Sequence, residues 1–351
     1  MSLPTEPIGS IPRPAFLIEA LGDHAAGRID DAMLAVSTEK ALVDTLRRFE
    51  ETGSPVVTDG EQGKPSFVTY PIAGLDALAP DGAVIPFADG HTRQLPRLTG
   101  PFSYQIHADS YLAKARAHTD RPVKQAVIAA SAISLLYPAD GVPGYDRDQF
   151  LDDLVDGAEA DIRRSLDAGA HSVQIDFTEG RLSLKLDPSG ALLRAFVDLN
   201  NQVLDRFTDE ERKRIGVHTC PGGDQDSAHS LDVDYIDLLP ALFDLRAGNF
   251  YVQLASESDP RRVLGAIREH STEEQRVFVG VTDPIDPRVE TPEEVRDRVL
   301  TAAEFISLDR LGTCDDCGFS PFADDVSTSR DTAFAKIAAR VAGTRLAAEL
   351  L

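Results

Sequence analysis

The sequence has 351 residues, 42% of them hydrophobic, and a formal net charge of -23 at pH 7. Barrels of alternating strands and helices reach this length as one domain, so we expect a single domain over residues 1–351. The acidic charge is spread along the chain, which disfavours nucleic acid and anionic membranes as partners. No run approaches the roughly 18 apolar residues of a membrane span, and the N-terminus lacks the features of an export signal, so we expect a cytoplasmic protein.

The first 110 residues or so are irregular, and their Pro-rich and Gly-rich loops predict a loop or hairpin region within the same domain. From about residue 120, short β-rich runs alternate with amphipathic helical stretches, the signature of βα units around a parallel sheet. The predicted strands are 123–130, 171–176, 215–219, 249–254, 277–281 and 311–313. The predicted helices are 150–166, 235–243, one that opens at Pro260, one capped by Thr291 and one from about Ser327. This alternation predicts an α/β fold, a single (β/α)8 TIM barrel.

Several reactive side chains lie at or just after the ends of predicted strands. In such barrels the active site is built from the loops at the C-terminal ends of the strands. The residues in these positions are His218, Cys220, Glu257, Asp283 and Cys317. We therefore expect them to face one site.

Three of these residues are candidate metal ligands. His218 and Cys220 are two apart, so on an extended strand end both side chains point the same way. Cys317 follows a later strand, and Gly318 would allow close backbone approach. A His/Cys/Cys set suits catalytic zinc with an exchangeable position. Spacing alone leaves the alternative of ordinary buried residues equally open, and Cys314 is interpreted as a core thiol.

Taken with other motifs, these residues resemble the catalytic C-terminal barrel of the cobalamin-independent methionine synthase family. The motifs in chain order are Ile8-Gly-Ser-Ile-Pro-Arg13, Asp59-Gly-Glu61, Gln174-Ile-Asp176, His218-Thr-Cys220, Gly280-Val-Thr-Asp283 and Asp316-Cys-Gly318. The resemblance implies a Zn²⁺ ion held by His218, Cys220 and Cys317, with a carboxylate as a fourth ligand that the thiol substrate displaces.

The fourth ligand is left open between two residues. The family's glutamate falls at Leu254 in the closest alignment, so Glu257 or Gln253 would have to substitute for it. Glu257 is chemically the better zinc ligand, and its alternative role is an acid that interacts with a helix dipole.

The resemblance also implies how a thiol substrate would be bound. Glu61 and Asp176 match the family's carboxylates that hold the amino group of homocysteine, and the backbone from Ile8 to Ser10 would contact its carboxylate. Basic residues near these loops could instead hold a sulfonate or carboxylate; they are Arg13, Lys64, Arg181 and Lys185.

The sequence departs from the family in two places. It contains no tryptophan, although methionine synthases stack the pterin of methyltetrahydrofolate on one. Ile285 replaces the family's proton-donating histidine, so Asp283 or Asp286 would have to supply the proton. The chain thus resembles the short, single-barrel branch, which also includes epoxyalkane:coenzyme M transferases.

Three functions follow as hypotheses. The first is zinc-dependent methyl or alkyl transfer from a donor to a thiol bound as a zinc thiolate, with homocysteine as the acceptor. The second is addition of another thiol, such as coenzyme M, to an epoxide. The third is a metal-independent barrel related to uroporphyrinogen decarboxylase. The sequence does not identify the donor, the pathway or the oligomeric state.

Overall fold

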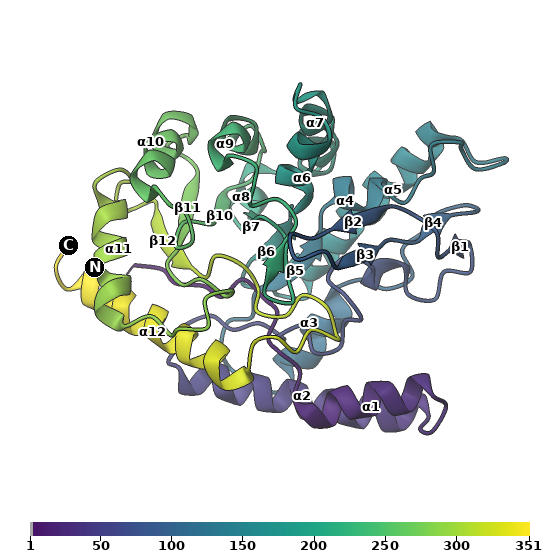
Figure 1. Ribbon diagram of the computed structural model, residues 1–351, viewed down its shortest axis with the longest axis horizontal. Coiled ribbons are helices and arrows are strands. Elements are labelled where there is room, and N and C mark those ends of the chain that lie inside the picture. The colour runs from purple at the N-terminus through teal and green to yellow at the C-terminus, as the bar shows by residue number, and fades with distance from the viewer. Residues whose placement is uncertain (1–2) are drawn as a thin grey trace.

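The computed structural model describes residues 3–351 and has a parallel sheet at its centre (Figure 1). Its six strands are hydrogen-bonded in the order β12-β11-β10-β7-β6-β5. They are β5 (Gln125–Ile128), β6 (Val173–Asp176), β7 (Ile215–Thr219), β10 (Asn249–Val252), β11 (Arg276–Gly280) and β12 (Leu311–Cys314). All six were expected from the sequence. In the run predicted as a strand over 123–130, the last residue was assigned to the wrong kind of element. The strand ends at Ile128, and the helix α4 (Ala130–Ser134) begins two residues later.

Two short segments of the irregular N-terminal region complete the barrel. Thr5 forms a parallel bridge with Thr313 of β12, and Val57 forms one with Val123 just before β5. The two segments meet where the Ile11 N–H donates to the carbonyl of Gly60 at 3.0 Å. Proline cannot donate to a strand ladder, and prolines at 4, 7, 12 and 55 interrupt both segments. Eight positions therefore close an α/β barrel, although two of them are too short to count as strands.

The helices surround these strands (Figure 1). They are α1 (Ala15–Ala25), α2 (Asp31–Glu51), α3 (Asp109–Arg116), α4, α5 (Arg147–Asp167), α6 (Glu179–Leu186), α7 (Ala191–Leu204), α8 (Asp209–Arg212), α9 (Tyr235–Phe243), α10 (Pro260–His270), α11 (Pro292–Ala303) and α12 (Arg330–Ala348), with a 3-10 turn η1 (Tyr70–Ile72). Thr291 and Glu294 form the capping box at the start of α11. The last helix starts at Arg330 rather than near Ser327, because Ser329 provides its N-cap.

Small antiparallel pairs lie outside the barrel. Within residues 78–98, β1 (Leu78–Ala79) pairs with β4 (Arg97–Leu98), and β2 (Val84–Pro86) pairs with β3 (Thr92–Gln94). A third pair, β8 (Gly223–Asp224) and β9 (Ser227–Ala228), follows β7. Residues of β2, β3 and β8 line a hollow that adjoins the site described below.

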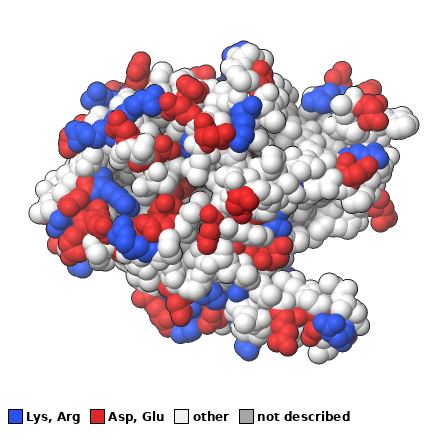
Figure 2. All heavy atoms as spheres, viewed as in Figure 1, with Lys and Arg blue, Asp and Glu red and all other residues white. Residues whose placement is uncertain are grey.

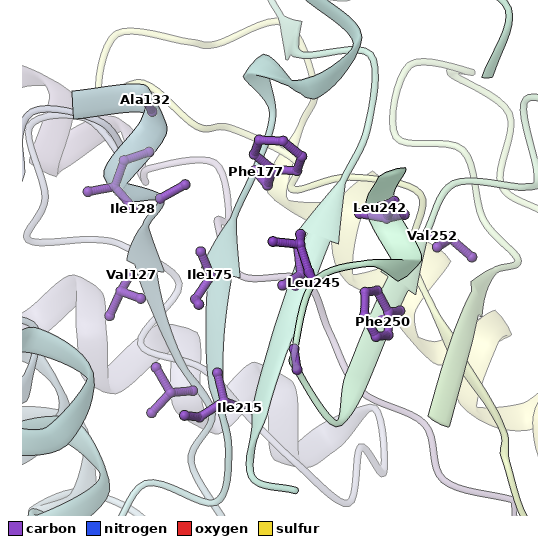
Figure 3. Packing of buried hydrophobic residues seen from close by; sticks show 14 of the residues in the cluster. Val127, Ile128, Ala132, Ile175, Phe177, Ile215, Leu242, Leu245, Phe250 and Val252 are labelled. Atoms are coloured by element: carbon purple, nitrogen blue, oxygen red, sulfur yellow. The ribbon is translucent and has the colours of Figure 1, made fainter. Parts of the chain in front are cut away.

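The core lies on both faces of the sheet, as parallel strands require. Every residue of β5, β6, β7, β10 and β12 is buried. Figure 3 shows apolar side chains of neighbouring strands, among them Val127, Ile175 and Phe250. Cys314 packs with Ile8, Tyr251 and Phe278 in a separate buried cluster, and burial raises the pKa of its thiol well above the usual value. The prediction of a core thiol is confirmed.

The surface carries the acidic charge as mixed ion pairs. Figure 2 shows Asp and Glu side chains interspersed with Lys and Arg over the visible face. No helix within residues 3–351 combines the length and apolar character needed to cross a membrane.

Candidate metal and thiol site

The three predicted metal ligands lie together at the C-terminal ends of the strands. His218 belongs to β7, Cys220 follows it directly, and Cys317 follows β12. Their ligand atoms all lie within 4.8 Å of one another, and the two Sγ atoms are 3.0 Å apart. All strands of a parallel barrel end at one rim, which explains how residues 97 positions apart in the chain meet here.

The donor chemistry of this group fits a zinc ion. His218 Nδ1 lies 3.3 Å from the carbonyl oxygen of Tyr251, which fixes the ring so that Nε2 is the free ligand atom. Within the described residues that Nε2 is buried and has no hydrogen-bond partner. The contact with Cys317 and the charge of His218 hold the pKa of the Cys220 thiol well below its usual value, although burial opposes this. A low thiol pKa and an unpartnered imidazole nitrogen are what metal binding requires.

A pocket beside this group contains the residues expected to bind a thiol substrate. Its lining includes Ile8, Gly9, Ser10, Glu61, Phe67, Asp176, Thr178, His218, Cys220, Gly222, Gly223, Cys317, Gly318 and Pro321. Gly318 is needed for this arrangement, because a Cβ there would overlap Ser10 Oγ. The structure thus brings Ile8, Ser10, Glu61 and Asp176 to the three candidate metal ligands.

Glu61 is held at the pocket by a strained turn. Its φ of 56° is in the left-handed region, which non-glycine residues rarely adopt. The Asp59 carboxylate accepts from the Glu61 N–H at 2.9 Å and stabilises this conformation. Such strain is found where the surrounding structure holds a functional side chain in place.

Lys64 lies behind Glu61 and not in the pocket. Its Nζ donates to Glu61 Oε1 at 3.3 Å and to the carbonyl of Ala126 at 2.9 Å. Burial lowers the pKa of Lys64, but Glu61 and Asp59 outweigh this effect and raise it. The lysine therefore orients Glu61 and does not line the pocket, and its role as a direct substrate ligand stays a prediction.

Arg13 is likewise a positioning residue. Its Nη1 donates to the carbonyls of Ser320 and Phe322, and its Nη2 donates to those of Glu61 and Lys64. The guanidinium thereby joins the loop of Glu61 to the loop that follows Cys317. These bonds occupy both terminal nitrogens, and Arg13 does not line the pocket, so its role as a substrate ligand stays a prediction.

Asp176 closes the opposite side of the pocket at the end of β6. Gln174 Nε2 donates to its Oδ1 at 2.7 Å. Burial raises the pKa of Asp176 to about 7, and the charge of Glu61 adds to that shift, while His218 and Lys64 partly offset it. Two carboxylates therefore share a buried site, an arrangement that favours binding of a cation between them.

Glu257 does not join the metal group in the structure. Its Oε1 accepts from Arg181 Nη1 at 3.2 Å and from Gln253 Nε2 at 2.9 Å. The loop that carries Glu257 is held by Asp316, whose carboxylate accepts from the N–H groups of residues 254 to 256. Glu257 and Gln253, the two predicted alternatives for the fourth ligand, are thus hydrogen-bonded to each other and to Arg181.

The two aspartates predicted as proton donors also lie outside the pocket. Asp283 Oδ1 accepts from the N–H of Ile285, and Asp286 Oδ1 accepts from the N–H of Arg288, each at 2.9 Å. These bonds shape the turn after β11, since short polar side chains commonly bond the backbone two residues on.

Sequence reasoning missed other residues near the site. Thr178 and Phe67 line the pocket, and Glu179 and His229 line a hollow that adjoins it. The available signal was the position of Glu179, three residues after Asp176 at the same strand end.

Comparison with known proteins agrees with this geometry. The model of the family described as cobalamin-independent synthase, catalytic domain, matches residues 3–332. The chain is 24% identical over 357 residues to the methionine synthase of Sulfurisphaera tokodaii, covering 99% of this chain and 94% of that protein. It is 22% identical over 322 residues to the methionine synthase of Pyrococcus furiosus, covering 90% and 86%.

Solved structures show the same fold. A B12-independent methionine synthase from Shewanella sp. W3-18-1, in complex with selenomethionine, superposes with a TM-score of 0.79 at 21% identity, covering 100% of this chain and 99% of that one. The corresponding protein from Listeria monocytogenes gives a TM-score of 0.74 at 18% identity, covering 100% and 99%. Both structural similarities extend over the whole barrel. Because the family match covers nearly the entire chain, this protein belongs to the family of cobalamin-independent synthase catalytic domains.

Proposed function

We propose that the protein catalyses zinc-dependent transfer of a methyl or related alkyl group to the sulfur of homocysteine. The observation that carries this proposal is one pocket that holds a His/Cys/Cys group together with two buried carboxylates, Glu61 and Asp176. The names of the relatives in Sulfurisphaera and Pyrococcus, both methionine synthases, support it.

His218, Cys220 and Cys317 would hold the zinc ion. When bound, zinc supplies a Lewis acid that deprotonates a coordinated thiol, whose free pKa is about 8.5. Three protein ligands of this kind leave a position for substrate, as catalytic zinc sites do. Glu257 remains a candidate resting ligand, and to reach the metal it would have to leave Arg181.

The chain's other residues orient the amino acid. Glu61 and Asp176 provide the negative charge that a substrate ammonium group needs in a buried site. Lys64 and Arg13 hold Glu61 in its left-handed turn, and the backbone at Ile8 to Ser10 offers groups for the substrate carboxylate. Such fixed positioning brings the sulfur to the donor in a productive orientation.

The described pocket lining contains no Lys or Arg side chain, which favours homocysteine over a sulfonate thiol such as coenzyme M. Arg13 and Lys64 are bonded to Glu61, Arg181 is bonded to Glu257, and none of the three basic residues is in the lining. A decarboxylase that needs no metal would leave the convergence of His218, Cys220 and Cys317 unexplained.

The test is zinc content together with zinc-edge X-ray absorption, with homocysteine and with coenzyme M. We expect one zinc per chain and a rise from two to three sulfur ligands with homocysteine only. No zinc, or no change with homocysteine, would contradict the proposal, and a change with coenzyme M alone would favour the second function.

A further inference from the structure

The two candidate sulfur ligands are carried by loops that follow different strands. Cys220 is followed by residues 221–230, which include β8 and β9 and are called the Cys220 loop. Cys317 is followed by residues 318–328, called the Cys317 loop, in which the structure has no helix or strand. Both sulfurs can bind one metal ion tightly only when these two loops are held at a fixed separation.

The direct hydrogen bonds between the two loops are long. The N–H of Gln225 donates to Asp325 Oδ2 at 3.3 Å, and the hydroxyl of Thr328 donates to Asp226 Oδ1 at 3.3 Å. Both distances exceed the usual range for such hydrogen bonds. Within the described residues, the loops are joined more firmly by a side chain that belongs to neither of them.

That side chain is Arg93 of the β2–β3 hairpin. Its Nε and Nη2 donate to the two carboxylate oxygens of Asp224 at 2.5 and 3.1 Å. Its Nη1 and Nη2 donate to the two carboxylate oxygens of Asp324 at 2.9 and 3.0 Å. Asp224 lies in the Cys220 loop and Asp324 in the Cys317 loop. One guanidinium thus bridges the loops by two bidentate contacts, a geometry that arginine provides and lysine does not.

The hairpin that carries Arg93 is itself fixed against these loops. The N–H of Ala88, just after β2, donates to the carbonyl of Ala228 in the Cys220 loop at 3.2 Å. Ile85 and Arg93 are paired across the hairpin, so their side chains lie on the same face, and both line the hollow beside the thiol pocket. The Arg93 guanidinium also lies 4.2 Å from the ring centroid of Phe322, a residue of the Cys317 loop.

The two ends of the bridge differ in exposure. The side chain of Asp224 is 0% exposed, and His91 Nε2 lies 3.1 Å from its Oδ2 as a second partner. The side chain of Asp324 is 67% exposed. Removal of Asp324 therefore cuts the bridge at the Cys317 loop without leaving a buried carboxylate unpaired.

On the basis of the proposed function, which requires the metal, we propose that Arg93 is a positioning residue of the metal site. Its bridge holds the Cys220 and Cys317 loops at the separation that lets both sulfurs bind one zinc ion. All three guanidinium nitrogens are bonded to carboxylates, and Arg93 does not line the thiol pocket, so it does not act as a substrate ligand. Its effect on the reaction passes through the two sulfurs.

The experiment measures zinc affinity, by competition with a chelator, in the wild type, Asp324→Ala and Arg93→Lys. Asp324→Ala removes one end of the bridge. Arg93→Lys keeps a positive charge beside Asp224 but lacks the fork that binds two carboxylates at once. We expect each variant to bind zinc about 10–100-fold more weakly, the range for loss of a residue that orients a metal ligand.

Asp81→Ala is the matched control, because Asp81 is 64% exposed and its carboxylate also accepts from an arginine, Arg97. Denaturant unfolding of the zinc-free proteins should give the same midpoint for Asp324→Ala and Asp81→Ala, and only Asp324→Ala should lose zinc affinity. The double variant of Arg93→Lys and Asp324→Ala should bind zinc no more weakly than the weaker single variant, since both act on one bridge.

Three outcomes would overturn the inference. They are unchanged zinc affinity in both Arg93→Lys and Asp324→Ala, an equal loss of affinity in Asp81→Ala, and losses that add in the double variant. Because Asp324 is exposed, Asp324→Ala keeps the test decisive even where Arg93→Lys folds poorly.

Zinc-edge absorption with homocysteine separates this inference from the function on which it rests. If the wild type binds no zinc, both fail. If it binds zinc but gains no sulfur ligand with homocysteine, the proposed function fails, while weaker zinc binding by the two variants still supports the role of Arg93. If it gains a sulfur ligand and the variants bind zinc as tightly as the wild type, only the role of Arg93 is overturned.

Discussion

Two buried clusters of ionisable residues lie inside the same barrel, and they differ in how their charges are satisfied. Near the N-terminal ends of β5 and β6, Glu6 accepts from the Tyr251 hydroxyl at 2.6 Å and lies 3.6 Å from Lys124 Nζ and 3.4 Å from His171. Burial alone would raise the pKa of Glu6, but His171, Lys124 and Tyr251 outweigh it and lower the pKa to about 2. The charge of Glu6 is therefore compensated by its neighbours, although Lys124 Nζ has no hydrogen-bond partner among the described residues.

The cluster at the C-terminal ends of the strands is not compensated in this way. Asp176 has its pKa raised to about 7, and His218 Nε2 has no partner among the described residues. Buried groups that have raised pKa values or unused hydrogen-bonding atoms are typical of functional sites. Buried ion pairs that compensate each other are typical of residues that stabilise the fold. The difference predicts that changes in the first cluster affect stability and that changes in the second affect binding.

The largest effect is expected from Cys220→Ser. Loss of a metal ligand should lower zinc affinity by more than the roughly 10–100-fold that is lost when a residue hydrogen-bonded to a ligand is removed, with activity lost in parallel. Metal analysis and activity measure this, and Cys314→Ser is the control because that thiol lies in the core cluster. A Cys220→Ser protein with a full zinc content would contradict the site.

Glu6→Gln should mainly destabilise the fold. It leaves the buried Lys124 without its carboxylate, which costs about 3–5 kcal/mol, and should not change the KM for homocysteine. Because the pKa of Glu6 is lowered from 4.5 to about 2, its contribution to stability is present above about pH 4.5 and is lost as pH falls through about 2. Denaturant unfolding should therefore show the wild type and variant converging at low pH. A difference that is constant between neutral and acidic pH would rule out this account.

Glu61→Gln and Asp176→Asn should act on substrate binding. Removing one member of a buried charge pair costs about 2–5 kcal/mol, so the KM for homocysteine should rise at least about 30-fold. 4-Mercaptobutyrate lacks the amino group and provides the matched substrate, whose binding should change little. Equal losses for both thiols would show that the carboxylates do not recognise an ammonium group.

A substitution outside both clusters shows how the protein responds to a loss of stability that does not involve either cluster. Thr291→Ala removes the capping box of α11 and should cost about 1 kcal/mol of stability, with zinc content and KM unchanged. Thermal unfolding and metal analysis check this. A loss of zinc in this variant would mean that the site responds to any local destabilisation, which would weaken the comparison.

The parts of this molecule that could be predicted from sequence depend on local rules. The strand from Ile215 to Thr219 and the helix from Tyr235 to Phe243 were expected with their observed bounds, because short β-rich runs and apolar spacing are local signals. The i,i+2 pair of His218 and Cys220 was visible for the same reason. The segments at Thr5 and Val57 were not identified as barrel strands, since each forms only an isolated bridge.

Within the site, the limits of sequence reasoning concern charged side chains. Arg13 and Lys64 were predicted to bind substrate, and Asp283 and Asp286 to donate a proton, from their residue types and positions. The structure places Arg13 on the carbonyl of Ser320, 307 residues away, and gives Glu179 the position beside the thiol pocket. The partner of a flexible charged side chain depends on which loops the fold brings next to it. No pattern among neighbouring residues in the sequence predicts that placement.

The sequence by itself determined the βα alternation, the helix caps and the family of this protein, because hydrophobic periodicity, capping and ordered motifs are written in neighbouring residues. Only the tertiary structure decided which carboxylates face the His/Cys/Cys group and which are neutralised by Lys and Arg. The reason is physical: the charge state of a buried group is set by the atoms packed around it, and in a closed barrel those atoms come from distant parts of the chain.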